Sequence, residues 1–211
     1  MVNPPVQNGH PPHHKYPTPA GESLYPLYLL TQARRIYDDP EYPLANSARQ
    51  AWTTFFASGA LWMKEALTLL RGQPITECRS NWNVLGSIKY GLASVGAFLP
   101  VAGAWFWDCP WLLILCIPVF YAIEGQMIFL FPLAMDGCST PFSEAWRYTR
   151  RAGGTLKVMG VVLPLAFVMI FGGFFGQGFV RCWCLGCLSV CLWYEEIRLQ
   201  IAAEEARKCG K

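Results

Sequence analysis

Four stretches of the chain are long, apolar and almost free of charge. They are residues 84–107, 111–135, 155–176 and 178–193. A helix rises about 1.5 Å per residue, so about 20 residues cross the ~30 Å hydrocarbon core of a bilayer. The first three stretches meet that length, and the fourth is somewhat shorter. The pattern predicts an all-α, polytopic membrane protein with four transmembrane helices.

The remaining segments differ in character. Residues 1–23 contain a run of prolines together with all three histidines, and they predict an extended tail. Residues 24–82 carry two helical patterns and are predicted to lie on the cytoplasmic side or in the membrane interface. Residues 83–197 form the predicted four-helix transmembrane domain, and residues 198–211 form a charged C-terminal tail.

The first helical pattern before the spans covers residues 24–37. It places Leu27, Leu30 and Ala33 on one predicted face. Two aspartates followed by Pro40 are a typical stop signal, so we expect the helix to end there.

The second helical pattern, at about residues 47–71, is more apolar and allows two interpretations. Lys64 and Glu65 form an adjacent charge pair inside it. A helix that lies in the membrane interface tolerates such a pair better than one that crosses the bilayer. We favour the interfacial position, and a fifth crossing remains the alternative.

Lys and Arg residues test this layout independently. With four spans threaded in order, every Lys and Arg except Arg181 falls on the side of the N-terminus. Cytoplasmic loops of membrane proteins carry such an excess of basic residues. We therefore expect both termini on the cytoplasmic side of a bacterial inner membrane or an equivalent membrane.

The overall composition agrees with a membrane location and argues against other classes of protein. The chain is 53% hydrophobic and only 15% charged, whereas soluble domains carry about 25% charged residues. The aromatic content argues against disorder, and the scattered cysteines argue against a disulfide-stapled secreted domain. The net charge of +3 is explained by the inside-facing Lys and Arg, so we expect no nucleic-acid partner.

Tryptophans gather near the ends of the predicted spans, where their amphipathic rings suit the headgroup level. The predicted interfacial belt consists of Trp52, Trp82, Trp105, Trp107, Trp111, Trp146 and Trp193.

Between the second and third spans, residues 140–152 predict a second interfacial, amphipathic helix. Thr140 can cap it, and Pro141 suits its first turn. Its polar side would face anionic lipid or a partner subunit. The candidate docking residues are Trp146, Arg147, Arg150 and Arg151. An anchor that only sets topology is the favoured alternative to a docking element.

This helix has the form P-x-x-E-A-W-R-x-x-R-R and follows a span that contains Pro132. The last span ends in Trp193-Tyr194-Glu195-Glu196. Over about residues 115–197, these features resemble the YciC-like bacterial membrane families, which include the membrane domain of some glycerophosphodiester phosphodiesterases. The resemblance implies a helical membrane architecture and no activity.

Glu124 is the most informative single residue, because a charged carboxylate inside a membrane is costly. Gln126 is nearby, and Lys89 could pair with Glu124 only if its side chain reached deeper than snorkelling favours. Glu124 is part of a proton or ion pathway, a ligand for a pigment or metal, or a structural acid. The structural interpretation is favoured, and it predicts that Glu124→Gln leaves folding and assembly intact.

Two small-residue patterns complete the candidates. Cys182, Cys184, Cys187 and Cys191 lie close together in the fourth predicted span. We expect helix packing or lipid contact there. A metal site is disfavoured because one straight helix cannot surround a tetrahedral ion, and a disulfide or acylation is the other alternative. Gly172 and Gly176 form a small-xxx-small face suited to close helix packing.

No catalytic set is present, so we expect no enzyme and no catalytic residues. No predicted span contains histidine, the usual haem ligand, so we predict no cofactor; a peripheral pigment or a lipid remains compatible. The leading functional hypothesis is an accessory or structural subunit of a larger integral-membrane complex of respiratory, photosynthetic or secretory type, with other integral-membrane subunits and anionic lipids as partners. The alternative is a small transporter or channel that uses Glu124 as an intramembrane proton or ion site.

Overall fold

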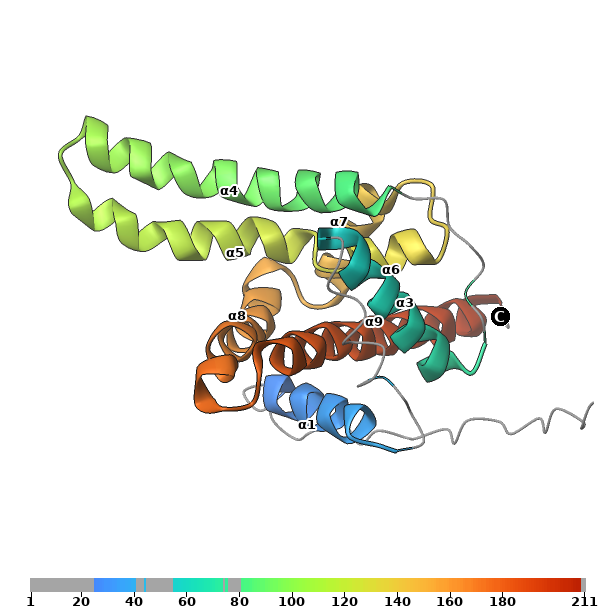
Figure 1. The fold of residues 1–211 in the computed structure, drawn as a ribbon. Helices are drawn as coiled ribbons and strands as arrows, with labels where there is room; N and C mark the ends of the chain where they lie inside the picture. The colour runs from blue at the N-terminus through green and yellow to red at the C-terminus, as the bar shows by residue number, and fades with distance from the viewer. Residues whose placement is uncertain (1–24, 41–43, 45–54, 74, 76–80, 210–211) are drawn as a thin grey trace, which may run out of the picture.

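The computed structural model describes residues 25–40, 44, 55–73, 75 and 81–209. Every regular element in this part of the chain is helical (Figure 1). The elements are α1 (Tyr25–Tyr37), α3 (Phe55–Arg71), α4 (Trp82–Phe106), η3 (Pro110–Leu115), α5 (Cys116–Gln126), α6 (Leu130–Met135), α7 (Pro141–Arg151), α8 (Thr155–Phe171), η4 (Gly172–Phe175) and α9 (Phe179–Cys209). The predicted tail at residues 1–23 and the residues before 55 in the second helical pattern lie outside the described residues.

Among the described residues, three helical segments are long and apolar enough to cross a membrane. They are Trp82–Phe106, Pro110–Met135 and Thr155–Phe175. They match the first three predicted spans to within a few residues. The fourth predicted span, residues 178–193, forms the first half of α9 and does not belong to this set.

The second of these segments is not one continuous helix. It begins as the 3₁₀-helix η3, and residues 127–129 separate α5 from α6. Pro132 has no N–H to donate to the carbonyl of Ile128, so a regular α-helix would lose a hydrogen bond at this point. All six residues of α6 are buried, and α6 packs mainly against α7 and α3.

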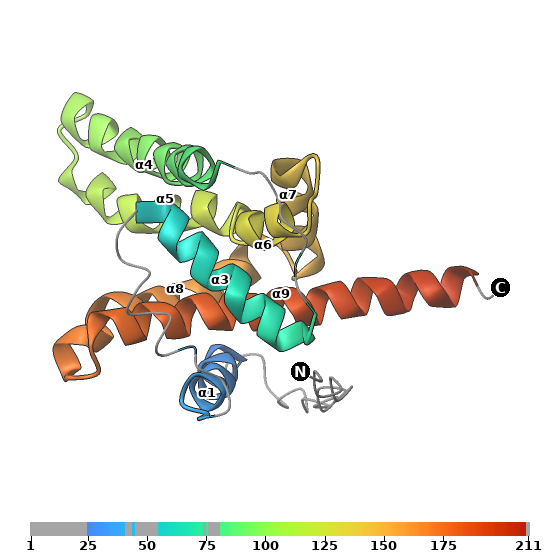
Figure 2. The ribbon, with the colours of Figure 1, turned by 45° about the vertical axis from the view of Figure 1, so that its right-hand side comes forward.

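The helices form two hairpins, α4–α5 and α8–α9, with α3 crossing between them (Figure 2). The far half of the α4–α5 hairpin extends away from the other helices (Figure 1). The last turns of α9 project beyond the rest of the molecule at the opposite end (Figure 2).

Helix α1 runs antiparallel along α9. The Tyr25 hydroxyl donates to Glu196 at 2.5 Å, and Arg181 pairs with Asp38 at 2.6 Å. These two contacts tie α1 to both ends of the α9 segment that the sequence predicts to cross the membrane. If that segment crosses, α1 lies beside it rather than wholly on the cytoplasmic side.

The buried face of α1 differs from the predicted one. Leu29 and Ala33 are buried with Tyr37, whereas Leu27 is exposed. A repeat of three residues drifts about 60° per step around a helix of 3.6 residues per turn, so Leu27 and Ala33 do not share a face. Leu29, Ala33 and Tyr37 are spaced four residues apart, so they stay on the side of α1 that faces α9.

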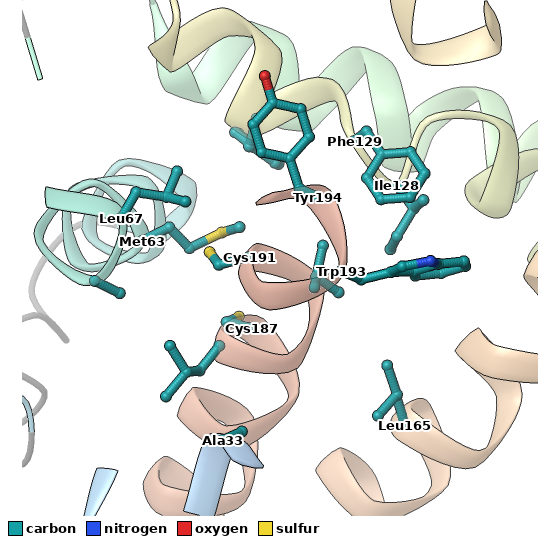
Figure 3. Close-up of a cluster of buried hydrophobic side chains, with 14 of the residues drawn as sticks. Ala33, Met63, Leu67, Ile128, Phe129, Leu165, Cys187, Cys191, Trp193 and Tyr194 are labelled. Atoms are coloured by element: carbon teal, nitrogen blue, oxygen red, sulfur yellow. The ribbon is translucent and has the colours of Figure 1, made fainter. Parts of the chain in front are cut away.

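The core lies where α9 packs against α1, α3 and α8, together with buried residues of the segment 127–135. Figure 3 shows Trp193 and Tyr194 of α9 turned toward Phe129, while Cys191 faces Met63 of α3. The rings of Phe129 and Trp193 are 5.1 Å apart in an edge-to-face arrangement.

The predicted tryptophan belt is therefore only partly correct. Trp193 is 4% exposed and belongs to the core, because its ring packs against Tyr25 of α1 and against Phe129. Trp105, Trp107 and Trp111 are strongly exposed at the tip of the α4–α5 hairpin. Trp52 lies outside the described residues.

Candidate functional site

Lys89 of α4 and Glu124 of α5 form a buried ion pair. The Lys89 Nζ lies 3.2 Å from the Glu124 Oε1, and the two side chains are 4% and 11% exposed. Each charge lowers the cost of the other in a region of low dielectric. The pair also joins the two helices of the hairpin.

Aromatic rings enclose the lysine. Its Nζ lies 4.9 Å from the centre of the Tyr90 ring and 5.8 Å from that of Phe131. The negative face of an aromatic ring attracts a cation. Lys89 is thus held inside the protein, and it does not extend toward the headgroups.

This arrangement corrects the prediction for Glu124→Gln. That substitution would leave the ammonium of Lys89 buried without its carboxylate partner. An unpaired buried charge is strongly destabilising. If Glu124 has a structural role, Glu124→Gln alone should therefore destabilise the fold. A variant that leaves no unpaired buried charge must replace both Lys89 and Glu124.

A partly open cavity of about 230 Å³ lies beside the ion pair. Residues of α3, α4, α5, α8 and α9 line it, together with Ile128 and Phe131. The lining residues with charged or hydroxyl-bearing side chains are Lys89, Tyr90, Tyr121 and Glu124. The apolar part of the wall includes Ala60, Met63, Leu165, Ala166, Trp183 and Val190. The cavity therefore lies between the two hairpins and beside α3.

Gln126 does not join this site. Its side-chain amide donates a hydrogen bond to the Thr155 hydroxyl at the start of α8. The Thr149 hydroxyl of α7 donates to the carbonyl of Gly125 at 3.2 Å. The end of α5 is therefore tied to α7 and α8, and Gln126 and Glu124 serve different contacts.

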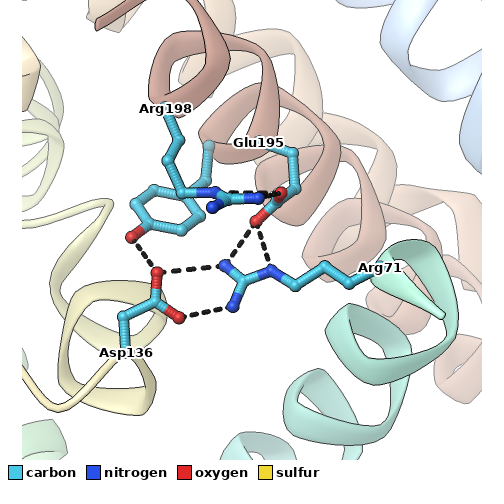
Figure 4. Close-up of polar contacts among 5 residues, drawn as sticks. Arg71, Asp136, Glu195 and Arg198 are labelled. Carbon is cyan, nitrogen blue, oxygen red and sulfur yellow. Dashed lines mark hydrogen bonds and ion pairs between the residues drawn. The ribbon is translucent and has the colours of Figure 1, made fainter. Parts of the chain in front are cut away.

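A second polar cluster, which the sequence pattern did not reveal, surrounds Arg71 at the end of α3 (Figure 4). Arg71 Nη1 pairs with the Asp136 carboxylate at 2.6 Å, and Arg71 Nε donates to Glu195 at 2.9 Å. Tyr194 donates to Asp136 at 2.6 Å, and Arg198 pairs with Glu195 at 2.6 Å. We call these five residues the Arg71 cluster. It joins α3, the end of α6, and α9.

Burial opposes the charge on Arg71, but its hydrogen bonds to Asp136 and Glu195 outweigh that cost. They raise the pKa of the guanidinium above its usual value. Arg71 therefore remains charged over the whole working pH range. Its two carboxylate partners lie 65 and 124 residues away in sequence, so no local spacing could have indicated the cluster.

The predicted helix at residues 140–152 is present as α7, but its contacts differ from the prediction. Thr140 stands at the N-cap and makes no side-chain capping bond. Ala145, Tyr148 and Thr149 form the buried face. Trp146 is half exposed, as an interfacial position requires.

The arginines of α7 have partners within the chain. Arg150 stacks on the ring of Trp146 at 3.4 Å, because the two are four residues apart and share a face. Arg147 pairs with Glu144 at 2.7 Å, and Arg151 pairs with Glu204 of α9. These contacts favour the anchoring interpretation of α7 over a free basic face.

Cys182, Cys184, Cys187 and Cys191 are all buried in α9. No group of three or more His, Cys, Asp or Glu side chains in the described ranges is arranged to hold a metal ion. Their surroundings are those of packing residues. Cys187, for example, lies on the wall of the cavity.

The predicted glycine face does not exist as a helix surface, because α8 ends at Phe171. Gly172 packs closely against α9, where an added Cβ would lie 2.6 Å from the sulfur of Cys182. Gly176 has a φ of +79° and forms the turn into α9. The two glycines thus have separate roles, one in packing and one in the turn.

Comparison with known proteins adds no further assignment. No protein-family model, no curated protein and no solved structure matches this chain.

Proposed function

We propose that this chain is a non-catalytic structural subunit of a larger integral-membrane assembly, and that the outer face of α4 receives a helix of a neighbouring subunit. The observation that carries the proposal is an exposed stripe of small residues, Ser87, Gly91 and Ser94. They stand at i, i+4 and i+7 and so share one face. We call this stripe the α4 small-residue face.

The α4 small-residue face suits a helix contact in lipid. An added Cβ at Gly91 would meet no atom of this chain within 4 Å. Small residues let two helix backbones approach closely, and serine hydroxyls can hydrogen-bond across the contact.

The packing of α4 leaves this face uncovered. Its main contacts within the chain are with α5, η3 and α3, and only 28% of its most apolar stretch is buried. The far half of the hairpin extends away from the other helices (Figure 1), and Ser87, Gly91 and Ser94 are also exposed in the nearer half of α4. Its surface is therefore available to a neighbour along much of its length.

The Lys89–Glu124 pair also supports a structural role. Each charge is neutralised by a partner in the same hairpin, and the pair holds α4 in register with α5. A subunit that presents α4 to a neighbour needs that register to be fixed.

Replacement of Gly91 tests the proposal. Gly91→Leu places a large side chain on the α4 small-residue face without a clash inside the chain. Gly160→Leu is the matched control, because Gly160 of α8 is also exposed and has no atom within 4 Å of an added Cβ. Both variants would be expressed at native level and solubilised in mild detergent.

We expect the native protein and Gly160→Leu to co-migrate with a fixed set of other membrane proteins on a native gel. Gly91→Leu should run separately from that set while it remains folded. A native chain that runs alone contradicts the proposal, and so does equal assembly of the two variants.

One observation favours a second candidate, a small transporter or channel. Glu124 lies on the wall of the cavity, next to Lys89. Purified protein in liposomes that contain a pH-sensitive dye would test this function. Proton flux that is lost in a Lys89→Met/Glu124→Met double variant, while the fold is retained, would favour transport over the structural role.

We also propose that both termini lie on the cytoplasmic side of a bacterial inner membrane or an equivalent one. The clustering of Arg71, Asp136 and Arg198 at one end of the helices supports this orientation, as does the tryptophan-rich tip at the other. Anionic lipids would then contact the exposed Arg147 on α7.

A further inference from the structure

We propose that the cavity beside Lys89 and Glu124 is a binding site for an uncharged, lipid-like molecule, with a hydrocarbon body and an oxygen that accepts a hydrogen bond. This inference goes beyond the proposed function, because it concerns the interior of the chain and holds with or without a neighbouring subunit.

The size of the cavity exceeds that of a packing defect. Its volume is about 230 Å³, whereas an engineered apolar cavity of roughly 150 Å³ already binds benzene. Protein interiors otherwise leave few voids larger than a water molecule. The side chains that line the cavity therefore gain contacts when a molecule larger than benzene enters it.

The chemistry of the wall selects a largely apolar ligand. Side chains such as Leu165, Ala166 and Val190 form most of the lining. Water is a poor occupant of this apolar part of the wall, because the polar side chains gather around Lys89 and Glu124. A hydrocarbon chain is the better match.

The ion pair selects an uncharged head. An anionic head near Lys89 would also approach the carboxylate of Glu124, 3.2 Å from the lysine nitrogen. A cationic head would meet the ammonium itself. The charges of the pair balance, so neither sign of ligand charge is compensated by the wall.

Lys89 provides the directional contact. Its ammonium carries three N–H groups, and Glu124 accepts one of them. The Tyr90 side chain forms a second hydrogen bond with Lys89, and the ring of Phe131 lies 5.8 Å from the nitrogen, so one N–H is left for a ligand. A carbonyl or ester oxygen in the cavity would accept a stronger hydrogen bond than an aromatic face offers.

This chemistry has two sources, the ester of a bilayer lipid and a free lipid-soluble carbonyl compound. Decylubiquinone serves as the free probe, decylbenzene as the analogue without oxygen, and palmitate as the anionic analogue. The full-length protein would be studied in nanodiscs of ester-linked or ether-linked phosphatidylcholine. Ether lipids have the same chains and lack the carbonyl oxygens.

Ala166→Phe fills the cavity from α8, and Ala166→Leu fills it in part. The matched control is Ala102→Phe, at an exposed position of α4 away from the cavity. The measurements are the thermal midpoint and its saturable shift with each probe. Ala166→Leu keeps the test valid if Ala166→Phe does not fold.

We expect at least one of two results in the native protein and in Ala102→Phe. Decylubiquinone should stabilise the protein saturably, about tenfold more tightly than decylbenzene or palmitate, which identifies a free ligand. Alternatively, exchange of ester for ether lipid should lower the thermal midpoint until decylubiquinone is added, which identifies the lipid ester. Both responses should weaken stepwise in Ala166→Leu and Ala166→Phe.

Three outcomes would overturn the inference. The first is an equal response of the native protein and the filled variants. The second is equal affinity for decylbenzene and decylubiquinone, which removes the role of the oxygen. The third is tighter binding of palmitate than of decylubiquinone, which removes the selection for an uncharged head.

Discussion

The ammonium nitrogen of Lys89 lies 3.2 Å from a carboxylate oxygen of Glu124, and this contact joins α4 to α5 at a point where both side chains are buried. Each charge would be costly in the membrane on its own, and the pairing offsets the cost of burying both. The same pair forms part of the wall of the central cavity. Stability, hairpin register and any ligand contact therefore depend on the same two residues.

Breaking this pair should cost more than removing it. We expect Lys89→Met or Glu124→Met alone to lower the free energy of unfolding by about 3–5 kcal/mol, because each leaves a buried charge without its partner. The double variant should recover most of that loss, since apolar side chains of similar size fill both positions. Unfolding in mixed detergent and SDS micelles measures all three. Losses that simply add would mean that the two residues do not interact.

Arg71 should contribute to stability through the attachment of α3. We expect Arg71→Ala to lower the free energy of unfolding by about 2 kcal/mol, because Asp136 and Glu195 lose a charged hydrogen-bond partner in a partly buried site. Arg34→Ala is the control, since Arg34 is 66% exposed and pairs with Asp38 at 3.5 Å. Its effect should stay below about 0.5 kcal/mol. Equal effects in the two variants would show that the Arg71 cluster does not hold α3.

The contact between α1 and α9 should give the protein an alkaline limit. Burial, followed by the hydrogen bond to Glu196, raises the pKa of Tyr25 above its usual value near 10. Above pH 10 the unfolded tyrosine loses its proton while the folded one keeps it. The unfolded state then binds fewer protons, so the free energy of unfolding falls as pH rises. Below pH 10 the two states bind this proton equally.

Tyr25→Phe removes the titrating group and tests this effect. Between pH 10 and pH 12, the variant should lose about 1 kcal/mol less stability than the native protein, after allowance for the partial exposure of Tyr25. Its lower starting stability at pH 8 does not enter the comparison, because only the change with pH is used. Parallel pH profiles for the two proteins would exclude Tyr25 as the source.

Two native cysteines at opposite ends of the molecule allow a direct test of topology. Cys109 lies at the tip of the α4–α5 hairpin, and Cys209 is exposed at the end of α9. In spheroplasts, a membrane-impermeant maleimide should label Cys109 and should reach Cys209 only after the membrane is opened. Cys109→Ser and Cys209→Ser identify each signal. Labelling of both cysteines from one side would contradict the proposed threading.

The position of α1 can be read in the same experiment. Asp38 pairs with Arg181 at the start of α9, and the exposed Pro40 follows it. A Pro40→Cys variant in the Cys109→Ser background should therefore be labelled from outside, if α9 crosses the membrane with α1 beside it. Labelling from inside only would place this end of α9 on the cytoplasmic side and would remove the fourth span.

The three long apolar helices are predictable because the signal is local. A contiguous run of about 20 apolar residues favours a helix in lipid whatever its neighbours are, since every backbone group is satisfied within the segment. Both ends of α4 and the start of α8 therefore fall close to the predicted ones. The tryptophans at the hairpin tip follow from the same transfer preference, because they stand next to such runs.

The contacts that hold the helices together could not be read in this way. The pairing of Lys89 with Glu124 depends on the angle at which α5 meets α4, and the Arg71 cluster depends on the turn between α5 and α6 at residues 127–129. The burial of Trp193 depends on Phe129, which lies more than sixty residues earlier. Each of these is a choice of partner among distant side chains.

Transfer of a helix into lipid depends on its own side chains, so the residue order of this chain was enough to locate three candidate spans. Choice of partner depends on where the other helices lie, and many arrangements bury the same apolar area. The tertiary structure resolves that choice, and with it the neutral ion pair, the cavity and the attachment of α1 to α9. The physical reason is that the hydrophobic term is additive and non-directional, whereas charge pairing and packing require defined positions of both partners.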